Sequence, residues 1–149
     1  KLADILRVQI GRGAPNLVAP ADRAIAAIEA TGHVPADLPR ELGALFPPYA
    51  GPFLQQLLAF DPAQALAASR LPCLLLQGAA DRQIVPMDDV QPLIDALGKR
   101  DAPGEAVIIP AASHNLKVAP WPTDAGFTGP IAPAAATKLT SWMKQVLGA

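Results

Sequence analysis

The stretch Leu71-Pro-Cys-Leu-Leu-Leu-Gln-Gly-Ala-Ala-Asp-Arg-Gln-Ile-Val-Pro86 decides the fold of this 149-residue chain. Residues 73–76 form a continuous apolar run bounded by Pro72 and Gly78, which is typical of a strand covered on both faces, as in a parallel sheet. The turn that follows contains Gly78 and carries the carboxylate of Asp81. The sequence therefore predicts a buried strand that presents an acidic side chain just beyond its carboxyl end.

A second strand is predicted at residues 106–109, after a helix that begins at Asp89 as N-cap and ends at Gly98. The apolar positions of this helix follow the i, i+3, i+4, i+7 spacing. A strand–helix–strand connection of this kind is right-handed and its strands are parallel, so both strands end at the same edge of the sheet. His114 follows the second strand, and we expect it to meet Asp81 at that edge, where open α/β sheets place their sites.

The rest of the chain has helical patterns. Helices are predicted over residues 1–10, 21–30, 36–46 and 53–58, in a short segment opened by Asp61-Pro62, and in a final segment from Ala135 that stops at Gly148. We therefore predict an α/β chain with an all-helical first part, residues 1–68, and a β-α-β-α second part, residues 69–149.

The composition and the residue spacings argue against several classes of function. Hydrophobic residues make up 51% of the chain, and 12 basic against 13 acidic residues give a net charge of −1, which argues against nucleic acid as a partner. Cys73 is the only cysteine, which excludes an intramolecular disulfide, and two histidines with one cysteine give no metal-ligand spacing. No apolar run predicts a membrane span. Gly11-Arg-Gly13 is followed by Asn16 where a dinucleotide fingerprint needs glycine, so we expect neither metal nor cofactor.

The second part resembles the C-terminal portion of an α/β-hydrolase, close to the esterase and dienelactone-hydrolase-like branch. Gly78-Ala-Ala-Asp81 with Pro86 matches the strand that carries the acid of that superfamily, and Pro110-Ala-Ala-Ser-His114 matches the loop that carries its histidine. The resemblance implies a Ser-His-Asp site with Asp81 as the acid and His114 as the base. It also implies that the helical first part is lid-like and that the substrate is a small carboxylic ester or a related acyl compound.

The nucleophile of that superfamily is missing from this sequence. Its elbow reads Gly-x-Ser-x-Gly, and no glycine here has a serine two positions later, because the serines are Ser69, Ser113 and Ser141. The chain also begins at Lys1, directly in a helical pattern. We therefore expect it to be part of a longer protein whose serine lies upstream, and we expect the isolated chain to be inactive.

The sequence is also compatible with other interpretations. Asp81 could be only a turn residue, Asp124 could replace it as the acid, and Trp121 could line a substrate pocket or cover the sheet edge. The chain could also be a non-catalytic binding module that pairs with its missing half or with itself through an exposed sheet edge, or a hydrolase relative that has lost its activity.

Overall fold

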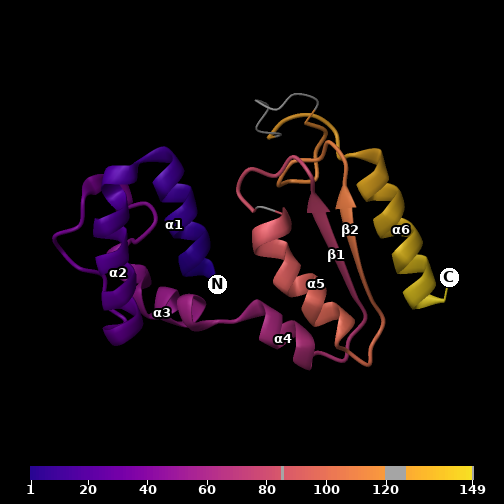
Figure 1. The fold of residues 1–149 in the computed structure, drawn as a ribbon, viewed down its shortest axis with the longest axis horizontal. Helices are drawn as coiled ribbons and strands as arrows, with labels where there is room; N and C mark the ends of the chain where they lie inside the picture. Colours follow the sequence, from indigo (N-terminus) through magenta and orange to yellow (C-terminus); the bar gives the residue numbers. More distant parts are fainter. Residues whose placement is uncertain (85, 120–126, 149) are drawn as a thin grey trace. The chain divides into compact units, whose positions relative to one another are not determined.

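The computed structural model describes residues 1–84, 86–119 and 127–148. It divides into a helical unit, Lys1–Asp61, and a sheet unit, Pro62–Ala149, each of which is shown in Figure 1. The sheet unit combines helices with two parallel strands, so the chain is of mixed α/β class. The division falls at Asp61 and Pro62, seven residues before the predicted boundary, because helix α4 (Pro62–Ala68) packs against helix α5 (Gln91–Gly98).

The helical unit contains α1 (Leu2–Gly13), α2 (Val18–Thr31) and α3 (Gly51–Ala59). Helix α2 contains the predicted helix of residues 21–30 and ends at Gly32, whose φ of 68° is left-handed and whose N–H donates to the carbonyl of Ile28. The buried core of this unit consists of Ala3, Ile10, Ala21, Ala24, Ile25, Ile28, Leu42, Phe46, Leu54 and Leu58.

Two predictions for the helical unit were wrong in extent. Residues 36–46 form no α-helix, and only Arg40–Leu42 makes a single 3₁₀ turn. Pro39 has an extended backbone before that 3₁₀ turn, and Gly43, a residue of low helix propensity, follows the turn. The helical spacing of the leucines therefore does not lead to an α-helix. Helix α1 instead runs through Gly11 to Gly13, beyond the predicted end at residue 10, and the N–H of Ala14 donates to the carbonyl of Ile10 where it ends.

The sheet unit contains β1 (Cys73–Gly78) and β2 (Gly104–Ile109), which pair in parallel, as predicted. Their register runs from Cys73 opposite Gly104 to Gly78 opposite Ile109, so the two strands end level with one another. In Figure 1 the strands lie between α5 and the last helix, α6 (Pro133–Leu147). The loops after β1 and β2 therefore start side by side at one edge of the sheet.

The start of α5 differs from the prediction. A π-helical turn, Pro86–Val90, precedes the helix, which begins at Gln91 with Val90 as N-cap instead of at Asp89. Pro92 lies in the first turn of α5, where a proline costs no backbone hydrogen bond because the first N–H groups of a helix have no partner within it.

The sheet unit has a buried cluster rich in alanine: Ile109, Ala112, Ala132 and Ala135. Val90, Ala96 and Leu97 are buried as well. Residues 73–76 of β1 are half-buried, so the described residues cover this strand only in part. Helix α6 gives little cover, because among its residues only Ala135 is buried while Leu139 and Met143 stay 45% and 46% exposed. None of the helices in the described ranges combines the length and apolar composition that crossing a bilayer requires.

Candidate active site

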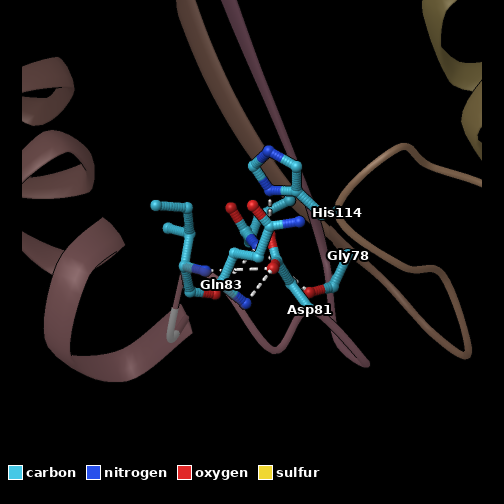
Figure 2. A network of polar contacts seen from close by, with 6 residues as sticks. Gly78, Asp81, Gln83 and His114 are labelled. Atoms are coloured by element: carbon cyan, nitrogen blue, oxygen red, sulfur yellow. Dashed lines mark hydrogen bonds and ion pairs between the residues drawn. The ribbon is translucent and has the colours of Figure 1, made fainter. Parts of the chain in front are cut away.

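Asp81 and His114 meet at the carboxyl edge of the sheet. The Nδ1 atom of His114 lies 2.9 Å from Oδ2 of Asp81, although the two residues are 33 positions apart in the sequence (Figure 2). Asp81 stands in the turn after β1 and His114 in the loop after β2. The parallel pairing thus brings together the two residues that the sequence singled out.

Gly78 allows the histidine loop to approach the end of β1. A Cβ atom on Gly78 would lie 2.3 Å from the carbonyl oxygens of both Ala112 and Ser113, closer than any real side chain tolerates. Backbone bonds hold this approach: the N–H of Ala79 donates to Ile109 O and that of Ala80 to Ala112 O, each at 2.9 Å. The absence of a side chain at Gly78 therefore sets how near His114 can come to Asp81.

The histidine loop is itself tightly folded. His114 occupies a turn closed by the N–H of Leu116 donating to Ser113 O, and the N–H of Ser113 donates to Lys117 O. Ala111 and Leu116 adopt left-handed conformations, with φ of 52° and 55°, which non-glycine residues rarely adopt. Such backbone strain persists only where surrounding contacts enforce it, as the hydrogen bonds of this turn do.

The carboxylate of Asp81 is hydrogen-bonded on both oxygens. Its Oδ1 accepts the backbone N–H groups of Gln83 at 2.8 Å and Ile84 at 3.0 Å. Its Oδ2 accepts one hydrogen bond from Nε2 of Gln77 at 2.8 Å and another from Nδ1 of His114. The side chain is only 2% exposed, so these four bonds replace the water that an ionised carboxylate needs.

These contacts decide the charge of Asp81. Burial by itself would raise the pKa of this carboxyl, but the donors on Ile84, His114, Gln77 and Gln83 outweigh it and hold the pKa below its ordinary value. Asp81 is therefore an anion at neutral pH, and it faces the histidine ring as a hydrogen-bond acceptor.

The other side of the His114 ring is accessible. The side chain is 41% exposed, and among the described residues no hydrogen bond engages its Nε2 atom. His114 lines a cavity of about 220 Å³ together with Arg82, Gln83 and Phe127. With Nδ1–H directed at Asp81, the neutral form of the ring has its lone pair on Nε2, where it can accept a proton from a group that enters this cavity.

A second cavity, of about 370 Å³, lies at the opposite edge of the sheet, beside the segments that enter the two strands. Arg100 lines it and donates from Nη2 to the carbonyl of Leu71 at 2.5 Å and to that of Pro103 at 3.3 Å. These bonds tie together the entries to β1 and β2, so we read this region as structural.

The chain's serines occupy other positions. Ser69 precedes β1 and accepts the N–H of Leu71, and Ser141 on α6 donates to the carbonyl of Lys138. Ser113 is 1% exposed and stands directly before His114 in the tight turn.

Within the described ranges, no three His, Cys, Asp or Glu side chains gather in a way that could hold a metal ion. Asp124 and Trp121 lie outside the described residues.

Gln77 is the member of this network that the sequence did not single out. It follows the apolar run of β1 directly and is buried, although it is polar. A buried amide needs hydrogen-bond partners, and a glutamine at the carboxyl end of a strand that carries an acid was the available signal.

Comparisons of this chain with protein-family models, with curated proteins and with solved structures found no match.

Proposed function

We propose that this chain supplies the acid and the histidine of a Ser-His-Asp hydrolase that cleaves carboxylic esters or related acyl compounds, with the serine upstream of the chain. The observation that supports it is the 2.9 Å contact between His114 Nδ1 and a carboxylate that is buried, ionised and fully bonded. A histidine oriented in this way through one nitrogen and exposed through the other has the geometry of a general base.

The proposed reaction uses both ring nitrogens of His114. The upstream serine oxygen attacks the acyl carbon while Nε2 takes its proton, and Asp81 stabilises the resulting imidazolium through Nδ1–H. The imidazolium then returns the proton to the alcohol oxygen as the bond between that oxygen and the acyl carbon breaks. A water molecule repeats the sequence on the acyl-enzyme, so that the acid product leaves and the serine is restored.

In this proposal the sheet unit forms the end of a larger parallel sheet and the helical unit is the lid-like segment. The half-buried apolar residues of β1 are consistent with further cover from outside the chain. The missing N-terminal half is then the partner of this chain, and the substrate reaches His114 in the joined protein.

The test is made on the longer gene product. We expect a fluorophosphonate probe to label it on a serine upstream of Lys1, and the His114→Ala variant to lose ester hydrolysis by a factor of about 10³ or more. The matched control is His33→Ala, which replaces the chain's other histidine, a loop residue whose Nδ1 lies 2.8 Å from Thr31 O. Ester hydrolysis at the wild-type rate in His114→Ala would refute the proposal.

A second candidate, a non-catalytic interaction module, is favoured by the exposed apolar face of α6, where Leu139, Met143 and Val146 are uncovered. This candidate predicts that the fluorophosphonate probe does not label the longer gene product and that the product hydrolyses no ester. The chain would still bind the N-terminal half or a second copy of itself.

A further inference from the structure

We propose that Gln77 is a positioning residue of the Asp81–His114 pair, whose side-chain amide fixes the Asp81 oxygen that orients the histidine. The inference rests on the proposed function for its catalytic meaning, but the contact it describes can be tested in this chain alone. Gln77 lies at the carboxyl end of β1, four residues before Asp81.

The surroundings of Gln77 determine which way its amide faces. Nε2 lies 2.8 Å from Asp81 Oδ2, 3.1 Å from the carbonyl oxygen of Gly78 and 3.3 Å from that of Ile84. All three neighbours are hydrogen-bond acceptors, so only the NH₂ end of the amide satisfies them. Since this group has two hydrogens for three acceptors, the shortest contact, to Asp81, takes the largest share.

The contact constrains the same oxygen that His114 uses. Oδ2 of Asp81 accepts Gln77 Nε2 on one side and His114 Nδ1 on the other, while Oδ1 is held by two backbone N–H groups. A proton on Oδ2 would displace one of its two donors. Gln77 therefore favours the ionised carboxylate and leaves one direction on Oδ2 for the imidazole N–H.

A purely structural role is the competing explanation, because Gln77 also ties the end of β1 to the turn at Ile84. The two roles differ in what they predict for titration. A structural tie affects stability alone, whereas a positioning residue also affects the protonation of Asp81 and the tautomer of His114.

The experiment is an NMR titration of the isolated chain, following the Asp81 carboxyl carbon and the ring nitrogens of His114. In Gln77→Met, which keeps the length but removes the donor, we expect the pKa of Asp81 to rise toward its ordinary value and the Nδ1–H tautomer of His114 to lose population. The matched control is Gln91→Met: Gln91 Nε2 also donates to an aspartate four residues later, Asp95, at 2.8 Å, but on an exposed helix face. We expect no change at Asp81 or His114 in that control.

A folded Gln77→Met chain with wild-type titration of Asp81 and His114 would overturn the inference. If Gln77→Met does not fold, the titration of the wild-type chain provides the test. We expect the side-chain amide resonances of Gln77 to shift with pH at the same midpoint as the Asp81 carboxyl carbon. Amide resonances that do not follow this midpoint would also overturn the inference.

In the longer gene product, Gln77→Met should lower kcat about tenfold with little change in KM, the effect of losing roughly one hydrogen bond to a charged group. Altered titration in the chain together with full hydrolysis by His114→Ala would leave the contact established and refute only the function.

Discussion

Gly78 and Ser113 lie so close that a single methyl group cannot be placed between them: a Cβ on Gly78 would be 2.3 Å from the Ser113 carbonyl oxygen. The residue that ends β1 and the residue before His114 are thus in backbone contact. The geometry of the Asp81–His114 pair depends on this contact, because it sets the distance between the two loops that carry them.

Replacing Gly78 with alanine should therefore move the histidine loop. We expect Gly78→Ala to lower the free energy of unfolding by about 1–3 kcal/mol, the usual cost of overpacking, and to lengthen the contact between His114 and Asp81. Chemical denaturation and the His114 ring-nitrogen shifts measure the two effects. Gly98→Ala is the control, since a Cβ there meets nothing within 4 Å. Equal stability of the two variants would contradict the steric argument.

Asp81 and His114 should contribute very differently to stability. Asp81→Ala removes the side-chain acceptor of the Gln83 and Ile84 N–H groups and one of the three acceptors of the Gln77 amide, and should cost about 1–3 kcal/mol. His114→Ala removes one bond from an exposed side chain and should cost less than about 1 kcal/mol. Urea unfolding of both variants tests this, and a larger loss in His114→Ala would show that the ring has a structural role.

The stability of the chain should depend on pH through Asp81. Its folded pKa lies below the ordinary value near 3.8, so the native state binds the proton less well than the unfolded state. The stabilisation is therefore complete above the ordinary pKa and is lost as pH falls through the folded one. Unfolding free energies from pH 7 to pH 2 should show the gap between wild type and Asp81→Asn shrinking on acidification. Asp95→Asn controls for the loss of one surface charge, and a gap that does not change with pH would refute the linkage.

The apolar face of α6 should make the isolated chain self-associate. Leu139 and Met143 are about half exposed, and burying them between copies releases ordered water. We expect the double variant Leu139→Lys, Met143→Lys to remain monomeric at concentrations at which the wild type shows larger species in sedimentation velocity. Gln145→Lys adds charge to the same helix at an exposed polar position and should not change association. A monomeric wild type at all concentrations would contradict the expectation.

Sequence patterns predicted the meeting of Asp81 and His114 better than they predicted the helices around them. The parallel pairing follows from an apolar run, an intervening helix and a second run, and the pairing alone brings Asp81 and His114 to one edge. The contacts of Gln77 were not predicted, because its three acceptors come from backbone and side-chain positions that only the folded turn brings together.

The predictions that differ from the structure concern single elements of the chain. The leucine spacing of residues 36–46 predicted a helix, but Pro39 and Gly43 limit that segment to one 3₁₀ turn. The cover expected over β1 is only partial in this structure. Hydrophobic periodicity marks residues suited to burial and does not reveal what buries them.

The helical unit draws its buried cluster entirely from residues between Ala3 and Leu58, ahead of the point where the chain passes into the sheet unit at Asp61 and Pro62. Its interior is thus self-contained in the linear order of the polypeptide. A gene segment ending at that junction encodes every residue of this cluster, so we expect that segment to fold when it is expressed as a separate polypeptide.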